Sequence, residues 1–433
     1  SHRPARRHRL SLRVLGARGG TMTTAAVLAT GTELTRGELV NSNATWLAEN
    51  LTSRGFDVVE LATVGDDAAE IRATLERLSR KARVIVCTGG LGPTTDDLTT
   101  AVVAELLGVP LVRDPASFEA LRARLARFGR TVSDSNAKQT DFPAGATILP
   151  NERGTAPGFA VALGSALACF MPGVPSEMTR MFEAYVVPLL DPIERSARHQ
   201  VRLRCFGLPE SEVNDRLAGI EAAHGVVLGY RASMSELEVK VLAGGTSFDE
   251  ARTRAEAAAA EVRTRLGTNV YGEGTTSFSA VLVELLAARG ETLALAESCT
   301  GGLGAELVTR VPGASRVLVG GVVAYSNDVK VTLLGVPRAL LDAHGAVSEE
   351  VARAMAEGCR RVTGASYGLA FTGIAGPGGG SDEKPVGLVH LALASAAGTV
   401  VDRRVFPGTR EEIRRRAVYW GFGLLRRTLL TTA

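Results

Sequence analysis

The sequence predicts an α/β protein with two three-layer α/β domains, built on mainly parallel sheets and joined by a small α+β module. First, short apolar runs alternate with amphipathic helical patterns in residues 25–90 and again from 277 onward, as in parallel sheets covered by helices. Second, a strictly alternating strand, ELEVKVLAGG, stands beside an Ala-rich helix in the segment between them. Third, 433 residues are too many for one ordinary core.

The composition describes a globular chain whose positive charge is local. Hydrophobic residues make up 45% of the chain and charged residues 22%. Residues 1–21 hold six arginines and no acid, and without them 43 basic residues stand against 46 acidic ones, a net charge of −3. We expect residues 1–21 to be a basic extension that is disordered or lies upstream of a true start at Met22. The slightly acidic remainder makes nucleic-acid binding unexpected.

Cysteine usage and hydropathy indicate the compartment. The five cysteines are scattered, odd in number and without C-x-x-C spacing, which is typical of free thiols in a reducing cytosol and not of a structural zinc site. The chain shows no apolar run of membrane-spanning length and no signal-peptide core. We expect a cytoplasmic protein that does not interact with membranes.

The first domain is expected over residues 22–192. Its opening elements are expected to be strands at 25–33, 56–65 and 83–90, and helices at 41–55 and 66–82. This β-α-β-α-β order implies a parallel sheet, and ligands of such sheets bind beyond the carboxyl ends of the strands.

A glycine-rich stretch, TGGLGPTTDDLT, follows the third of these strands. Gly89, Gly90 and Gly92 would let the backbone approach an anion and donate N–H groups to phosphate. Thr94 lies just before a helix expected over 95–108, whose N-terminus also favours anions. The stretch therefore predicts a phosphate-binding turn.

Two aspartates in this stretch complicate that prediction. Asp96 and Asp97 would repel a bare phosphate, and a divalent metal bridging carboxylate and phosphate would remove the conflict, as in metal-assisted hydrolysis of a pyrophosphate. Alternatively, both aspartates only cap the helix and complement its dipole. The spacing leaves both interpretations open.

The middle domain is expected over residues 198–275. Strands are expected at 201–207, 226–233, 236–245 and 269–272, and helices at 209–220 and 248–267. A nucleic-acid-binding KH domain needs a Gly-x-x-Gly loop between helices with basic residues around it, and this segment has none. A spacer or dimerisation role is therefore expected, and we expect the protein to be a homodimer.

The last domain is expected over residues 277–433 and is again a layered α/β unit. Strands are expected at 291–298, 315–326, 366–373 and 387–395, and helices at 277–290, 301–311, 328–336, 348–364 and 410–427. The first two of these strands each deliver a polar group at the carboxyl end.

Ser298 ends the first of these strands and precedes a glycine pair. The backbone N–H groups of Thr300, Gly301 and Gly302 would then serve an oxyanion or a phosphate at a helix N-terminus. Cys299 is a rival nucleophile, because a helix N-terminus lowers a thiol pKa. The alternative is that Ser298 or Thr300 is only a helix cap.

Lys330 follows the second strand, in the first turn of a helix capped by Ser326 or Asn327. A cation there faces the positive end of the helix dipole, and desolvation would lower its pKa and make the neutral amine available as a general base. A serine activated by lysine is a recurrent variant of triad chemistry. Tyr325, at the same strand end, could relay a proton or hold substrate. The alternatives are a surface lysine and a packed tyrosine.

A third element is the loop from Thr372 to Ser381, TGIAGPGGGS. So many glycines, among them Gly373 and Gly376, cost stability unless the backbone approaches a ligand. The alternative is a flexible hairpin connection. Arg410, at the start of the last helix, is the candidate for a phosphate contact beside it.

The motifs together resemble one family. The N-terminal GTELTRGELVNSNATWLAENL, TGGLGPTTDDLT and PGVPSEM, and the C-terminal AESCTGG, VVAYSNDVK, GAVSEEVA, TGIAGPGGGSDEKPVG and FPGTREEIRRRA, are similar to those of CinA proteins. The resemblance implies a molybdopterin-binding-like domain, a KH-like middle domain and a C-terminal domain that also occurs alone as nicotinamide mononucleotide deamidase.

For the C-terminal domain, the resemblance implies hydrolysis of nicotinamide mononucleotide to nicotinate mononucleotide and ammonia, without a cofactor. It implies that Ser298 is the nucleophile and Lys330 its base, that Tyr325 assists and Thr372 orients the amide, and that Arg410 holds the 5′-phosphate.

For the N-terminal domain, the resemblance implies hydrolysis of ADP-ribose to AMP and ribose 5-phosphate with a divalent cation of the Mg, Mn or Co type. It implies that Glu33, Asp96, Asp97 and Glu177 lie near the metal or the pyrophosphate. Two alternatives are a nucleotide-binding domain without this activity and a non-enzymatic accessory protein of competence or DNA repair.

Overall fold

The computed structural model describes residues 23–193, 197–233 and 236–431, so the basic extension over residues 1–21 lies outside the described residues. The chain forms two compact units. The first consists of the described residues up to His199 together with Gly244–Arg252, and the second of Gln200–Ala243 and the described residues from Thr253 on.

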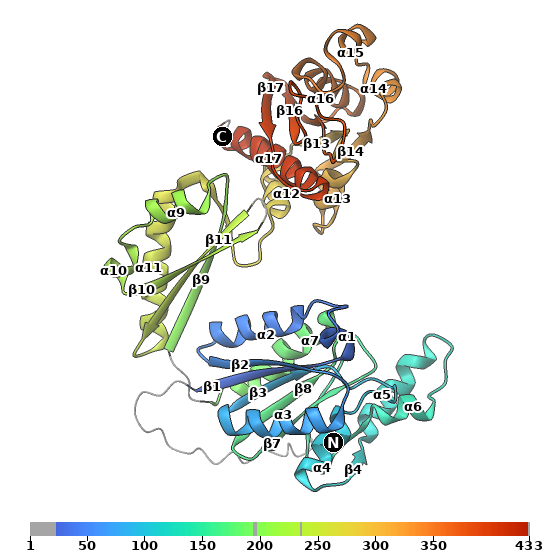
Figure 1. The fold of residues 1–433 in the computed structure, drawn as a ribbon, viewed down its shortest axis with the longest axis vertical. Helices are drawn as coiled ribbons and strands as arrows, with labels where there is room; N and C mark the ends of the chain where they lie inside the picture. Colours follow the sequence, from blue (N-terminus) through green and yellow to red (C-terminus); the bar gives the residue numbers. More distant parts are fainter. Residues whose placement is uncertain (1–22, 194–196, 234–235, 432–433) are drawn as a thin grey trace, which may run out of the picture. The chain divides into compact units, whose positions relative to one another are not determined.

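The N-terminal domain is built on a six-stranded sheet (Figure 1). Its strands, in spatial order, are β2 (Asp57–Val64), β1 (Thr24–Thr30), β3 (Val84–Thr88), β8 (Ala166–Met171), β7 (Gly158–Leu163) and β6 (Thr147–Leu149). The first four are parallel, and β7 and β6 continue the sheet antiparallel. Every residue of β1 from Ala25 on is buried, as a strand covered on both faces requires.

Helices cover both faces of this sheet. On one face, α2 (Ser42–Ser53) and α7 (Pro175–Met181) pack against the sheet, and on the other lie α3 (Ala68–Lys81) and α4 (Thr99–Leu107). Asn41 caps α2 by accepting the N–H of Ala44. The remaining elements are α1 (Thr32–Thr35), β4 (Leu111–Arg113), α5 (Pro115–Ala126), α6 (Asp134–Lys138), β5 (Asp141–Pro143), a π-helical turn (Phe182–Val186) and α8 (Val187–Leu190).

The middle module is a four-stranded sheet with helices on one side. Its strands, in spatial order, are β10 (Val226–Ser233), β11 (Glu236–Gly245), β9 (Ala197–Phe206) and β12 (Val270–Glu273), and its helices are α9 (Glu210–Arg216), α10 (Ile220–His224) and α11 (Phe248–Leu266), the last followed by a 3₁₀ turn (Gly267–Asn269). Leu237, Val239 and Val241 are buried together, as the alternation along the strand predicts.

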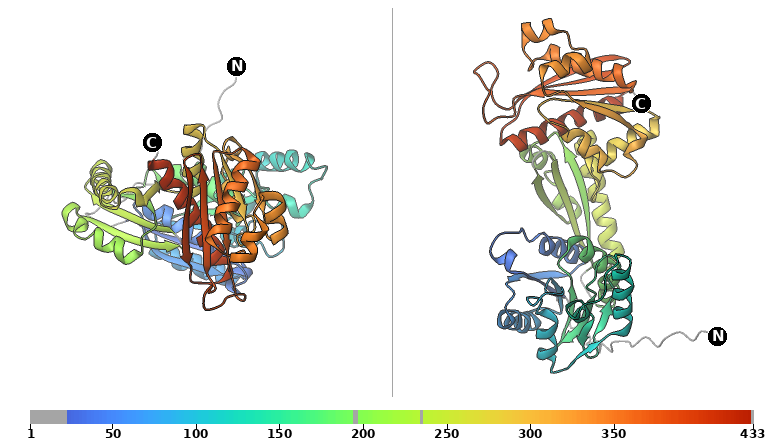
Figure 2. Two further views of the ribbon diagram at one scale, coloured as in Figure 1. Left: turned by 90° about the horizontal axis from the view of Figure 1, so that it is seen from above. Right: turned by 90° about the vertical axis from the view of Figure 1, so that its right-hand side faces the viewer.

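The C-terminal domain is built on a five-stranded sheet. Its strands, in spatial order, are β14 (Leu318–Val323), β13 (Leu293–Glu297), β15 (Tyr367–Gly373), β16 (Leu388–Ser395) and β17 (Gly398–Val405). The first three are parallel and the last two antiparallel. On one face lie α12 (Phe278–Arg289), α13 (Leu303–Thr309), a 3₁₀ turn (Ala314–Arg316) and α17 (Arg410–Thr431), and on the other α14 (Asn327–Leu334), α15 (Arg338–His344) and α16 (Glu349–Thr363). Figure 2 shows α17 in red on the face opposite the orange helices.

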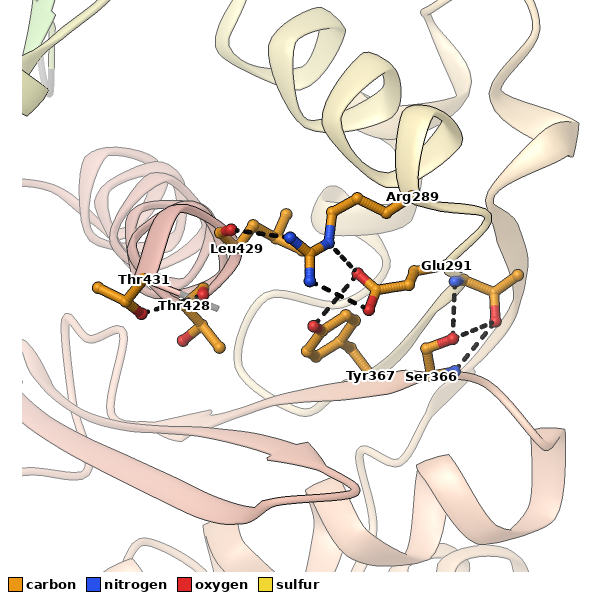
Figure 3. Close-up of polar contacts among 8 residues, drawn as sticks. Arg289, Glu291, Ser366, Tyr367, Thr428, Leu429 and Thr431 are labelled. Atoms are coloured by element: carbon orange, nitrogen blue, oxygen red, sulfur yellow. Dashed lines mark hydrogen bonds and ion pairs between the residues drawn. The ribbon is translucent and has the colours of Figure 1, made fainter. Parts of the chain in front are cut away.

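A polar cluster fixes the far end of α17 (Figure 3). Arg289, the last residue of α12, forms an ion pair with Glu291 at 2.6 Å and donates to the carbonyl of Leu429 at 3.2 Å. The hydroxyl of Tyr367 donates to the same glutamate. Arg410 lies at the opposite end of α17, in its first turn.

The described residues contain no helix with both the length and the hydropathy needed to cross a membrane. All five cysteines are free and buried.

Candidate active site

A cavity of about 220 Å³ lies at the carboxyl ends of β13, β14 and β15. This is the edge at which parallel sheets bind ligands. The lining side chains are Ser298, Cys299, Tyr325, Asn327, Lys330, Ala346, Val347, Thr372, Gly373, Ala375 and Arg410. The cavity therefore brings together five predicted residues, Ser298, Tyr325, Lys330, Thr372 and Arg410, although they are spread over more than one hundred positions. Thr300, Gly301, Gly302 and Gly376, which were also predicted to contact the substrate, are not among the lining residues.

Ser298 is held directly at the end of β13. Its N–H donates to the carbonyl of Phe371 on β15 at 2.9 Å, so the sheet ladder continues one residue beyond the strand. Its side chain lines the cavity while the residue is only 9% exposed. The hydroxyl is therefore aimed into the cavity from a rigid support.

Lys330 reaches the same point from α14 and is 1% exposed. Its Nζ donates to Ser298 Oγ at 3.2 Å and to the carbonyls of Ala324 and Tyr325 at 2.9 and 3.2 Å. Within the described residues it forms no ion pair with a carboxylate. Burial lowers the pKa of this ammonium, the direction expected from its sequence position.

Glu297 shapes the turn beside Ser298, and the sequence analysis did not assign it a role. Its buried carboxylate accepts the N–H groups of Gly302, Gly304 and Ala305 at 3.0, 3.0 and 2.9 Å. It therefore caps the start of α13 from the residue immediately before Ser298. The available signal was an acidic residue directly before a serine and a glycine pair that opens a helix.

Because of this cap, fewer backbone N–H groups are available to stabilise an oxyanion than the sequence predicts. The N–H of Gly302 is donated to Glu297, and the N–H of Gly301 is donated to the carbonyl of Ser298 at 3.1 Å. Two of the three predicted backbone donors are thus used within the turn itself. Thr300 remains as the third.

Cys299 does not have the lowered pKa expected at a helix N-terminus. The thiol is buried, and burial raises its pKa to about 12, with a smaller raising effect from Glu297. Desolvation outweighs the favourable charge of Lys330. The thiol is therefore protonated at neutral pH, which argues against Cys299 as nucleophile.

Three more predicted residues, Tyr325, Thr372 and Arg410, line the cavity. Arg410 donates to the carbonyl of Gly376 at 2.7 Å and to the hydroxyl of Tyr325 at 3.1 Å, and Tyr325 is 61% exposed. The hydroxyl of Thr372 is buried and donates to the carbonyl of Ala346 at 2.7 Å. A second arginine, Arg414, contacts the turn after Ser298 and was not singled out from the sequence.

The glycine-rich stretch of the N-terminal domain has an internal reason for two of its glycines. A side chain at Gly89, with φ of 102°, would place its Cβ 2.2 Å from the carbonyl oxygen of Thr30. At Gly90, with φ of 66°, the Cβ would lie 2.1 Å from Thr99 Oγ1. Close approach to β1 and α4 therefore requires glycine at both positions, whether or not an anion binds.

The second aspartate of this stretch, Asp97, forms hydrogen bonds within its own turn. Asp97 Oδ2 accepts the N–H and the hydroxyl of Thr94 at 2.8 and 2.6 Å, and its own N–H donates to the carbonyl of Thr94. These bonds hold a turn, so α4 begins at Thr99 and not at Thr95 as predicted. Neither aspartate is the N-cap of α4, which is Leu98. A Cβ at Gly92 would collide with the Asp97 carboxylate.

The other predicted metal ligands do not join this turn. Glu177 accepts a bond from Asn151 Nδ2 at 2.7 Å, while Glu33 and Asp96 are exposed. Among the described residues, no group of three histidine, cysteine, aspartate or glutamate side chains is arranged to hold a metal ion. The described residues therefore do not fit a resident metal centre.

Family models match three blocks of the chain. They are "CinA C-terminal domain" over residues 275–429, "Probable molybdopterin binding domain" over 26–192 and "Damage-inducible protein CinA KH domain" over 200–272. Together the three blocks follow the order of two α/β domains around a KH-like module.

Relatives match over nearly the full length. A CinA-like protein of Anaeromyxobacter sp. (strain Fw109-5) is 46% identical over 93% of this chain and 98% of its own, and one of Geobacter sulfurreducens is 44% identical over 94% and 99%. Among solved structures, competence damage-inducible protein A from Klebsiella pneumoniae is 34% identical over 35% of this chain and 95% of its own, with a TM-score of 0.35. With full-length relatives above 40% identity, the chain belongs to the CinA family.

Proposed function

We propose that the C-terminal domain hydrolyses the carboxamide of nicotinamide mononucleotide, giving nicotinate mononucleotide and ammonia. The observation that carries the proposal is the buried Lys330, whose Nζ lies 3.2 Å from Ser298 Oγ and whose pKa is lowered by burial. A serine and a neutral amine at this separation form a nucleophile and its general base.

The contacts of Lys330 match the needs of a neutral amine. A neutral amine has two hydrogens and one lone pair, and the carbonyls of Ala324 and Tyr325 accept the two hydrogens. The lone pair then faces Ser298 and accepts its hydroxyl proton as Oγ attacks the carboxamide carbon. The resulting ammonium is stabilised by the same two carbonyls.

The remaining steps use the same two side chains. The tetrahedral intermediate collapses, the C–N bond breaks, and the Lys330 ammonium gives its proton to the leaving nitrogen, which departs as ammonia. Lys330 then takes a proton from water, whose oxygen attacks the Ser298 ester. Collapse of the second intermediate breaks the ester bond, the Lys330 ammonium returns its proton to Ser298 Oγ, and the carboxylic acid product loses its own proton to solvent.

Thr372 and Arg410 supply orientation. Because the Thr372 hydroxyl gives its proton to the carbonyl of Ala346, its oxygen can only accept, which suits the N–H of a carboxamide. Arg410 stands at the exposed side of the cavity with its donors on a carbonyl and a phenol, neutral partners that an anionic 5′-phosphate can replace.

Product analysis tests this function. The purified full chain should release ammonia from nicotinamide mononucleotide without added metal. Ser298→Ala should abolish the release, whereas Cys299→Ala, which keeps the backbone and removes a protonated thiol, should retain most of it. No release by the unaltered chain, or full release by Ser298→Ala, would rule the proposal out.

For the N-terminal domain we propose binding of a phosphate-bearing nucleotide of the ADP-ribose class. The supporting observation is Lys138, whose ammonium donates to the carbonyls of Thr94 and Asp97 at 2.8 and 2.9 Å and so places a cation beside the glycine-rich stretch. Hydrolysis of the pyrophosphate is the finer proposal. Because the described residues form no metal centre, a divalent cation would have to enter with the substrate phosphates.

The two proposals for this domain separate in one experiment. Calorimetric titration with ADP-ribose in chelator measures binding alone, and AMP formation with and without added magnesium measures hydrolysis. No ADP-ribose binding in chelator together with no AMP formation in magnesium would contradict both proposals.

A further inference from the structure

Arg414 contacts the Ser298 turn (residues 298–302) at its backbone and does not enter the cavity lining. Its guanidinium donates from Nη2 and Nε to the carbonyl of Thr300 at 2.7 and 3.3 Å. It stands four residues after Arg410 on α17, so both arginines project from the same side of the helix toward the site.

The Thr300 carbonyl that Arg414 contacts belongs to a peptide group that is hydrogen-bonded to a second peptide group of the same turn. The peptide unit between Thr300 and Gly301 donates its N–H to the carbonyl of Ser298 at 3.1 Å. That carbonyl belongs to the peptide unit whose N–H is that of Cys299. Peptide groups linked by hydrogen bonds polarise one another. A cation at the Thr300 carbonyl therefore makes the N–H of Cys299 a stronger donor.

The N–H of Cys299 is well placed to stabilise an oxyanion. Glu297 takes the N–H groups at the start of α13, and in the described part of the chain the N–H groups of Cys299 and Thr300 donate to no oxygen of another residue. Cys299 lines the cavity and immediately follows the nucleophile, the position from which backbone N–H groups commonly stabilise an oxyanion.

We propose that Arg414 is a positioning residue for the deamidation, which fixes and polarises the Ser298 turn through the carbonyl of Thr300 so that the N–H of Cys299 stabilises the tetrahedral oxyanion. This inference rests on the proposed function of the C-terminal site. It assigns different roles to the two arginines of α17: Arg410 binds the substrate phosphate, and Arg414 acts on the transition state through the backbone.

The two roles predict different kinetic changes. Loss of a phosphate contact weakens substrate binding and raises KM, whereas loss of oxyanion stabilisation lowers kcat and leaves KM nearly unchanged. Losing a direct oxyanion donor costs about 10²–10³ in kcat. Because Arg414 acts one step behind the donor, we expect a smaller loss for its removal, roughly 10- to 100-fold.

The experiment is steady-state ammonia release from nicotinamide mononucleotide by the full chain. Arg414→Met should lower kcat by this amount with KM within about twofold, Arg414→Lys should recover part of the loss, and added guanidinium ion should restore part of the activity of Arg414→Met. The matched control is Arg289→Met, which removes an arginine-to-carbonyl contact at the other end of α17 (Figure 3) and should leave kcat nearly unchanged.

Three outcomes would overturn the inference. They are an unchanged kcat in Arg414→Met, a rise in KM at unchanged kcat, and a loss of kcat that accompanies a lower melting temperature and is recovered neither by lysine nor by guanidinium. An unaltered chain without ammonia release removes the proposed function as well, whereas an active chain with an indifferent Arg414 removes this inference alone.

Discussion

The carboxyl edges of the two α/β sheets both carry loops that contain glycine. The polar side chains at the two edges differ in their burial and in their hydrogen-bond partners. At the C-terminal edge, Lys330 is buried beside Ser298 in a cavity and forms no ion pair with a described carboxylate. At the N-terminal edge, Asp97 and Glu177 accept hydrogen bonds from their own neighbours, and Asp96 faces solvent.

The difference shows what a sequence motif does and does not establish. Both motifs mark loops where polar residues follow buried strands. The C-terminal one holds an ionisable group, Lys330, in an environment that disfavours its charged form, which is the property that chemistry uses. At the N-terminal edge Asp97 stabilises the loop itself, so reactivity there would depend on the groups that the ligand supplies.

The largest effect should come from removing the buried amine. Lys330→Met should reduce kcat for ammonia release by roughly 10²–10⁴-fold, because general base catalysis contributes about that much. Lys81→Met, which removes an exposed lysine paired with Glu60 in the other sheet domain, is the matched control and should not change kcat. If both variants behave alike, the contrast between the two edges has no catalytic meaning.

These residues show which parts of the candidate site could be predicted from the sequence. Ser298 and Lys330 were predictable because each follows a parallel strand, and the carboxyl ends of adjacent parallel strands meet. Arg414 was not singled out, because its partner is a backbone carbonyl group, which has no signature in the sequence. Glu297 did have a signal, an acidic residue shortly before a helix-opening glycine pair, but the backbone N–H groups that it accepts cannot be read from the sequence. The pKa of Cys299 was predicted in the wrong direction, because depth of burial cannot be read from a helix-start pattern.

The layered fold was predicted more completely than its edges. Apolar runs identified β1, β3, β13 and β15, because a strand covered on both faces must be apolar throughout. The start of α4 was misplaced by four residues, because a side-chain bond at Asp97 competes with helix formation there.

The pH dependence is the second test. Below the pKa of Lys330 the amine is protonated and cannot act as a base, so kcat/KM should rise about tenfold per pH unit until that pKa is reached. Burial lowers this pKa, so the plateau should begin below the ordinary lysine value of 10.5. A profile measured from pH 5 to 10 checks this. A plateau that extends unchanged down to pH 5 would argue against a lysine base.

The third test concerns the cap beside the nucleophile. Glu297→Gln keeps the shape but replaces one acceptor oxygen with an NH₂ group, so at least one of the N–H groups at the start of α13 loses its partner. A buried unpaired donor costs about 1–3 kcal/mol. The urea concentration at which ammonia release is half lost should therefore fall. Glu306→Gln, at an exposed pair with Arg310, is the control and should leave it unchanged.

The smallest effect is expected at the other edge, for Asp97→Asn. Asparagine keeps an oxygen that can accept the N–H and hydroxyl of Thr94, so the turn should persist and thermal unfolding in chelator should shift little, by less than about 1 kcal/mol. Ammonia release should stay the same.

If the unaltered chain forms AMP from ADP-ribose with magnesium and this variant does not, although it is equally stable, then the carboxylate has a chemical role that its bonds to Thr94 do not reveal. In that case the N-terminal turn would be a second reactive site, assembled only when substrate and cation are bound, and the contrast between the two edges would be one of timing: the C-terminal site is organised before substrate binds, and the N-terminal site by it.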